Sequence, residues 1–203
     1  IDFGSFVSPK AIPQLADTAE VLDLIDLTGR KSKLLAIIAN CRGASEGAKH
    51  EKITYLGYPH SISNTFLQKN INSTLEKSRD TIKEMMDICL KNNKILSVYY
   101  SMGFGNPYNE EWHVDQLIEE TELLNQIGVK RIILSDTIGV GTPERIEESF
   151  KKLIPAYPGI QFGFHLHTTL EQWYKKVDAA YQNGCRSFDG VLNGLGGCTM
   201  AGF

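Results

Sequence analysis

Short apolar or β-branched segments alternate with longer segments of helical periodicity along the whole chain. The seven predicted strands are IDFGSF (1–6), LLAIIAN (34–40), KITYLGY (52–58), KILSVYY (94–100), RIILSD (131–136), IQFGFHLH (160–167) and SFDGVL (187–192). The intervening segments place apolar residues on one helix face, as Ile146, Phe150 and Leu153 do. This alternation predicts an α/β fold, in which helices cover a parallel sheet.

A (β/α)₈ TIM barrel is the α/β architecture that we expect. Such a barrel has eight strands in about 250 residues, whereas this chain of 203 residues gives seven predicted strands. We therefore expect a barrel lacking its first strand and its C-terminal end here, with 1–203 forming a single catalytic domain. An open doubly wound sheet is the alternative, but no G-x-G-x-x-G follows a predicted strand, which disfavours its dinucleotide-binding version.

Composition limits the partners. The chain is 42% hydrophobic and 22% charged, with a formal charge of −3 and both signs interspersed. We expect no nucleic-acid partner and no membrane partner, because there is neither a basic patch nor an apolar run of about 20 residues. The four cysteines form no C-x-x-C pair, so we expect free thiols in a reducing compartment. The start at Ile1 rather than Met suggests a fragment, so an organellar targeting peptide upstream stays compatible with the sequence.

His165 and His167 are the strongest candidates for chemistry. Residues two apart on a strand point to the same side, so both imidazoles would face one point at the strand's carboxyl end. A shared metal ion explains such a pair better than two adjacent positive charges do. The alternative is that both are hydrogen-bonded histidines of the core or rim.

Other polar residues follow the ends of predicted strands. Asp136 could bind a metal-bound water or orient a substrate hydroxyl, or could simply cap a turn. Cys198 ends the loop GLGGC, whose glycines would let it close over a site; an unreactive thiol is the alternative. Lys10 is expected to be an exposed lysine, with an anion ligand as the alternative. The remaining histidines, His50, His60 and His113, are expected to be solvated and receive no role.

Several motifs, in order along the chain, resemble the 3-hydroxy-3-methylglutaryl-CoA lyase family of the DRE-TIM metallolyase superfamily. They are SFVSPK (5–10), KNIN (69–72), NPY (106–108), SDTIGVGTP (135–143), H-x-H (165 and 167) and GLGGC (194–198). The resemblance covers essentially the whole chain. It implies a TIM barrel with Mg²⁺ or Mn²⁺ at its carboxyl end.

The resemblance also implies roles for individual residues. His165 and His167 would be metal ligands, and His165, Asp136 and Cys198 would be catalytic, with Cys198 protonating an enolate. Asp2 would contact substrate at a position where the family usually has glutamate, as would the loop glycines Gly194, Gly196 and Gly197. The family's other ligands, an aspartate beside an arginine and an asparagine, belong to motifs that we expect outside residues 1–203.

The resemblance implies cleavage of 3-hydroxy-3-methylglutaryl-CoA to acetyl-CoA and acetoacetate. It also implies a cytoplasmic location and a homo-oligomer, expected to be a dimer. Thr168 and Asn106 depart from the family, which usually has aspartate and cysteine there, and this leaves the acyl-CoA substrate open. The alternatives are another acyl-CoA lyase, a Claisen-type synthase like isopropylmalate or citramalate synthase, and a non-catalytic barrel remnant.

Overall fold

A computed structural model describes residues 1–191 and shows one curved sheet of seven parallel strands. The strands are β1 (Asp2–Ser5), β2 (Leu34–Ile37), β3 (Ile53–Ser61), β4 (Ile95–Ser101), β5 (Arg131–Asp136), β6 (Gln161–Leu166) and β7 (Phe188–Asp189). Each strand pairs in parallel with the next one along the chain. This sequential order confirms the predicted TIM-barrel type, because a doubly wound sheet reverses its strand order at a switch point.

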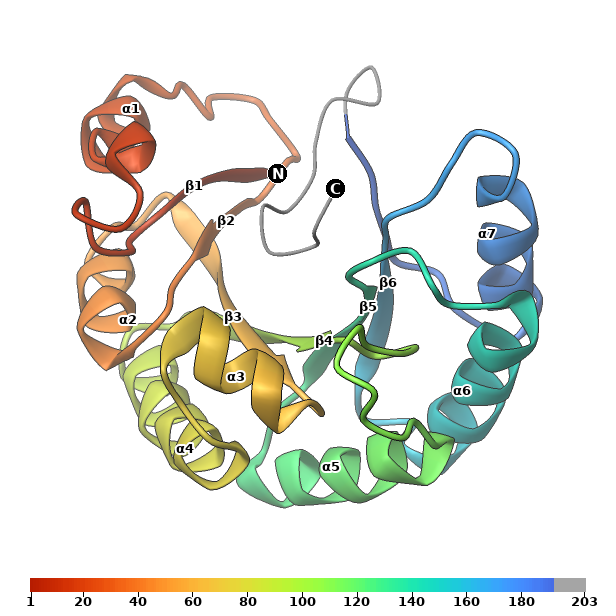
Figure 1. Cartoon of the computed structure of the whole chain (residues 1–203). Helices are drawn as coiled ribbons and strands as arrows, with labels where there is room; N and C mark the ends of the chain where they lie inside the picture. The colour runs from red at the N-terminus through yellow and green to blue at the C-terminus, as the bar shows by residue number, and fades with distance from the viewer. Residues whose placement is uncertain (192–203) are drawn as a thin grey trace.

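Helices form an arc outside the strands (Figure 1). They are η1 (Pro13–Leu15), α1 (Thr18–Leu24), α2 (Cys41–Ala48), α3 (Asn64–Ile71), α4 (Leu75–Lys91), α5 (Val114–Ile127), α6 (Pro143–Ala156) and α7 (Trp173–Gln182). Local sequence sets several starts: the Thr142 side chain accepts a hydrogen bond from the Arg145 amide, with Pro143 at the first helical position. Together the helices cover the outer face of the sheet (Figure 1).

The main hydrophobic core lies between the sheet and the helices. Alternate strand residues face outward, and Phe164 of β6 meets Phe104 and Phe150 with ring centroids 5.5 and 5.7 Å apart. All three rings are at most 1% exposed. Burying one such side chain stabilises the fold by roughly 1.5–3 kcal/mol. The opposite row of strand residues faces the barrel interior.

Three strands end three residues away from the predicted positions. β3 continues to Ser61, because its register with β4 persists as far as the pair Ser61 and Ser101. β2 stops at Ile37, and Asn40 instead caps α2 by accepting a hydrogen bond from the Gly43 amide. β7 is only two residues long, Phe188–Asp189, and residue 192 of its predicted range lies outside the described part.

The expectation that His60 is solvated is wrong. Its side chain is 0% exposed, with Nδ1 2.7 Å from Ser78 Oγ and Nε2 2.9 Å from Glu120 Oε1. Two polar partners on α4 and α5 make this burial possible. His50 is half-buried and stacks on Phe6, whereas His113 is exposed at the start of α5 as expected.

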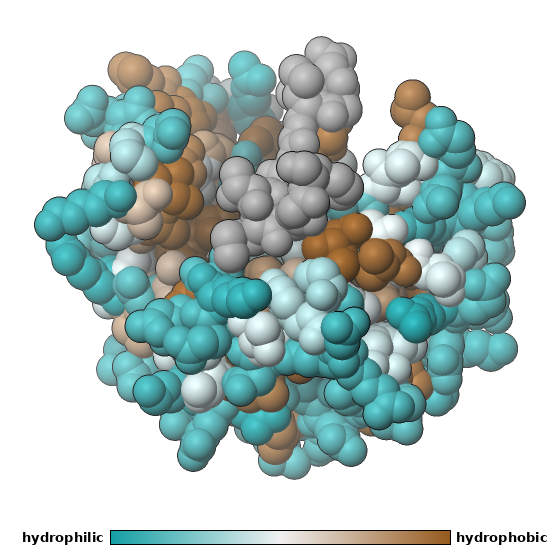
Figure 2. Space-filling view, viewed as in Figure 1, coloured by the Kyte–Doolittle hydropathy of each residue, from teal (hydrophilic) through white to brown (hydrophobic). Residues whose placement is uncertain are grey.

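The surface in Figure 2 is mostly hydrophilic on the side shown, with smaller apolar patches between polar side chains. Within residues 1–191, no helix combines the length and the apolar character that crossing a membrane requires.

Candidate metal centre and active site

The two histidines of H-x-H converge at the carboxyl end of β6. His165 is the penultimate strand residue, and His167 follows the strand directly. Their Nε2 atoms lie 3.2 Å apart, and both side chains are half-buried. The prediction that they point to the same side is confirmed. The ring of Tyr99 from β4 stands edge-on to His165, with centroids 5.9 Å apart, and so walls one side of the pair.

Asp189 orients His165 from the neighbouring strand. The register pairs the two residues, and Asp189 Oδ2 lies 3.0 Å from His165 Nδ1. Because an ionised carboxylate only accepts hydrogen bonds, we assign the proton to Nδ1, which leaves a lone pair on Nε2. A carboxylate behind a histidine is the usual support for a metal-ligating imidazole. Asp189 was not among the residues predicted from the sequence, although an acidic residue on the strand beside H-x-H was a usable signal.

The pair fits a divalent cation. Burial, followed by the nearby charge of His165, lowers the pKa of His167, so the neutral, ligating form is favoured. Their Nε2 atoms, 3.2 Å apart, lie close enough together that both could hold a single ion. Within residues 1–191, no third His, Cys, Asp or Glu joins them to complete a metal-binding group.

Asp2 belongs to the electrostatic surroundings of this pair. Desolvation by the surrounding protein, and then the charge of Asp189, raise the pKa of Asp2 to about 6. The residue as a whole is nevertheless exposed at the start of β1. A carboxyl group that titrates close to neutral pH can both give and accept a proton. The fold therefore brings Asp2 into the influence of Asp189 and His165, which are distant in sequence.

Asp136 lies at the same edge of the sheet but points toward the helices. It shares its row on β5 with the buried core residues Ile132 and Leu134, and is itself 1% exposed. Its Oδ1 accepts the Gly141 amide at 2.9 Å, and its Oδ2 is 2.8 Å from Lys176 Nζ on α7. Both oxygens are thus held by protein groups. Lys176 was not among the predicted residues, although it shares a helix face with the buried Ala180 four residues later.

Two further candidates came from the sequence, Lys10 and the GLGGC loop. Lys10 is exposed. Gly194, Gly196, Gly197 and Cys198 lie outside the described residues, so their predicted roles stay predictions.

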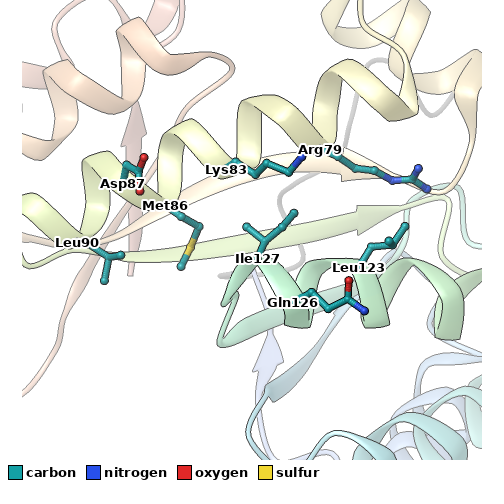
Figure 3. A pocket seen from close by; sticks show the side chains of 8 residues that line it. All are labelled: Arg79, Lys83, Met86, Asp87, Leu90, Leu123, Gln126 and Ile127. Carbon is teal, nitrogen blue, oxygen red and sulfur yellow. The ribbon is translucent and has the colours of Figure 1, made fainter.

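A surface groove of about 480 Å³ lies elsewhere, on the helical layer (Figure 3). Its walls come from α4 and α5 and include Arg79, Met86 and Ile127. None of the predicted site residues lines it, so we do not assign it to the catalytic centre.

Comparisons with known proteins match this geometry. The HMGL-like family model matches residues 11–202. A hydroxymethylglutaryl-CoA lyase of Bacillus subtilis is 33% identical over 99% of this chain and 67% of its own length. An (R)-citramalyl-CoA lyase of Chloroflexus aurantiacus is 27% identical over 99% of this chain and 66% of its own.

A solved structure agrees with the sequence matches. An HMG-CoA lyase from Acinetobacter baumannii, in complex with coenzyme A and 3-methylmalate, has a TM-score of 0.89 at 29% identity. The match covers 100% of this chain and 65% of that one. The chain thus spans about two thirds of the length of these relatives. Because the relatives are carbon–carbon lyases, they confirm the predicted enzyme class at the level of the family.

Proposed function

Because the chain belongs to the HMGL-like family, we propose that the protein cleaves 3-hydroxy-3-methylglutaryl-CoA to acetyl-CoA and acetoacetate in a metal-dependent reaction. The observation that carries this proposal is the convergence of His165 and His167, with Asp189 behind one of them. The acyl-CoA substrate is supported by the names of the relatives and by the coenzyme A in the Acinetobacter structure.

His165 and His167 would hold Mg²⁺ or Mn²⁺ through their Nε2 atoms. When bound, a divalent cation would polarise the substrate's tertiary hydroxyl and a carboxylate oxygen and lower the pKa of that hydroxyl. Asp189 accepts a hydrogen bond from the Nδ1–H of His165 and so keeps Nε2 free for its ligand. His167 supplies a second neutral nitrogen, since its pKa is lowered mainly by burial.

The reaction is a retro-Claisen cleavage. A base removes the proton of the tertiary hydroxyl, and the electrons of the adjacent carbon–carbon bond pass to the thioester side as that bond breaks. The hydroxyl carbon becomes the ketone of acetoacetate, and the enolate of acetyl-CoA then takes a proton. We propose Cys198 as the enolate's acid, with Gly194, Gly196 and Gly197 contacting substrate, on the family resemblance.

Two aspartates would serve this reaction differently. Asp2, whose pKa is raised to about 6, would contact substrate and can hold a proton near neutral pH. Asp136 would act by positioning rather than as a base, because its two oxygens already accept hydrogen bonds from Gly141 and Lys176.

A related thioester is the second candidate substrate. The citramalyl-CoA lyase matches almost the whole chain, and Thr168 follows the second histidine directly, where the family usually has aspartate. A residue so close to the metal centre can change which hydroxyacyl group fits. We therefore include citramalyl-CoA among the substrates to be tested.

The test measures acetyl-CoA release by the complete protein with Mg²⁺, with Mn²⁺ and with excess chelator. The accompanying ketone product is acetoacetate from 3-hydroxy-3-methylglutaryl-CoA and pyruvate from citramalyl-CoA. We expect metal-dependent product, abolished by His165→Ala or His167→Ala and retained by His113→Ala, whose side chain is exposed. Product from citramalyl-CoA alone would change the substrate but keep the reaction class. Wild-type activity in either histidine variant would refute the ligand assignment, and absence of both product and bound metal would favour a non-catalytic barrel.

From the family resemblance we also propose that the protein is a homodimer and that it is located in the cytoplasm. Light scattering of the purified complete protein tests the dimer, and fractionation of the source cells tests the location.

A further inference from the structure

Lys176 is a buried lysine that the proposed chemistry does not use. It lies on α7 and is 2% exposed, although its neighbour Lys175 is exposed on the same helix. Its Nζ is 2.8 Å from Asp136 Oδ2 and 2.8 Å from the Gly139 carbonyl oxygen. Burying an ammonium group costs several kcal/mol unless it is paired and hydrogen-bonded. The burial of this ammonium group therefore suggests that Lys176 has a role other than packing.

The groups that Lys176 holds belong to the loop between β5 and α6. The carboxylate of Asp136, which starts this loop, also accepts the Gly141 amide, and Thr137 Oγ1 accepts the Met102 amide at 2.8 Å. Gly139 has a φ of +72°, a conformation that L-residues rarely adopt. Lys176 therefore holds a loop whose shape depends on two features. One is the positive φ of Gly139, and the other is the set of hydrogen bonds that Asp136 and Thr137 accept.

This loop touches the backbone of the second histidine. A Cβ added to Gly139 would lie 3.2 Å from the His167 carbonyl oxygen, so the two backbones are in close contact. α7 in turn begins only a few residues after His167. The ammonium group thus links the helix that follows His167 to the loop that packs against it.

We propose that Lys176 is a positioning residue for the metal centre, acting through the Gly139 carbonyl and the His167 backbone. This inference rests on the proposed function, since it assumes that His165 and His167 bind a cation. The two hydrogen bonds of the Lys176 ammonium group go to Asp136 and Gly139, and not to either histidine.

The sign of the effect separates this role from the two simpler ones. If Lys176 acted only through its charge, neutralising it would tighten cation binding, because one positive charge near the site would be gone. If it served only stability, its loss would lower the free energy of unfolding and leave cation affinity unchanged. A positioning role alone predicts weaker binding after the positive charge is removed.

The experiment measures Mn²⁺ affinity by titration calorimetry on the complete, metal-free protein. We expect Lys176→Met to weaken binding about 10- to 100-fold, the usual effect of losing a group that supports a ligand. Lys175→Met is the matched control and should bind Mn²⁺ as the wild type does. Hydrogen exchange in the metal-free proteins should quicken in 137–142 and 166–172 for Lys176→Met alone.

A second pair of variants covers the case in which Lys176→Met fails to fold because Asp136 is left unpaired. In Asp136→Asn the lysine still reaches the Gly139 carbonyl, whereas Asp136→Asn/Lys176→Met has no buried charge here. We expect the double variant to bind Mn²⁺ at least about 10-fold more weakly than Asp136→Asn does. Equal or tighter binding would overturn the positioning role. If the wild type binds no Mn²⁺ but exchange still quickens in Lys176→Met, the proposed function fails rather than the loop contact.

Discussion

Glu120 should make the stability of this protein sensitive to acid. The residue is 3% exposed on α5 and accepts hydrogen bonds from His60 and from the guanidinium of Arg79. Burial alone would raise the pKa of Glu120, but the hydrogen bonds and charges of His60 and Arg79 outweigh it and lower the pKa from 4.5 to about 2. A carboxyl group whose pKa is lower in the folded state stabilises that state above the unfolded pKa.

The size of the effect follows from that difference in pKa. A fall from 4.5 to about 2 corresponds to on the order of 3 kcal/mol of unfolding free energy. This contribution is complete above about pH 5 and disappears as the pH falls from 4.5 toward 2. Glu120→Gln should therefore be about 3 kcal/mol less stable than wild type at pH 7, with a gap that narrows steadily below pH 4.5.

The assay is urea unfolding followed by circular dichroism at pH 7, 5, 4 and 3. Glu119→Gln, an exposed neighbour on the same helix, is the matched control and should stay within about 0.5 kcal/mol of wild type throughout. A gap for Glu120→Gln that stays constant between pH 7 and pH 3 would refute the reasoning, because it would mean that the ionised carboxylate does not supply the stability.

Two further predictions concern the metal centre and the core. Asp189→Ala should weaken Mn²⁺ binding about 10- to 100-fold, because His165 loses the carboxylate that fixes its Nδ1 proton; unchanged affinity in calorimetry would contradict this role. Phe164→Ala should cost about 3–5 kcal/mol in urea unfolding, since it opens a cavity beside two other buried rings. Tyr174→Ala, which removes an exposed ring, should change stability by no more than about 0.5 kcal/mol.

Local signals account for the parts of the fold that the sequence predicted. The start of α6 follows from Thr142 and Pro143, whose capping bond and fixed φ act within a single turn. The direction of His165 and His167 follows from strand geometry, which places residues two apart on one side. Both features depend on neighbouring residues only, so no tertiary contact was needed to anticipate them.

Long-range partners account for what the sequence did not reveal. His60 is buried because Glu120, 60 positions away, and Ser78 satisfy its two ring nitrogens. Lys176 is buried because Asp136, 40 positions earlier, and the Gly139 carbonyl do the same for its ammonium group. A histidine after a strand and a lysine on a helix are ordinary surface residues until the fold supplies such partners.

Strand alternation nevertheless offers a rule for sorting the polar residues at the carboxyl edge. His165 points to the opposite face of the sheet from its neighbour Phe164, which faces the helices. Asp189 likewise points away from the face of Phe188, whose ring centroid lies 6.5 Å from that of Phe164. Asp136 and His60 instead lie on the same face of their strands as Leu134 and Tyr58, which are buried against the helices. The first row can reach a ligand inside the barrel, whereas the second can only hold helices and loops in place. The row on which a polar residue falls, more than its nearness to the strand end, therefore predicts whether it takes part in chemistry or in support.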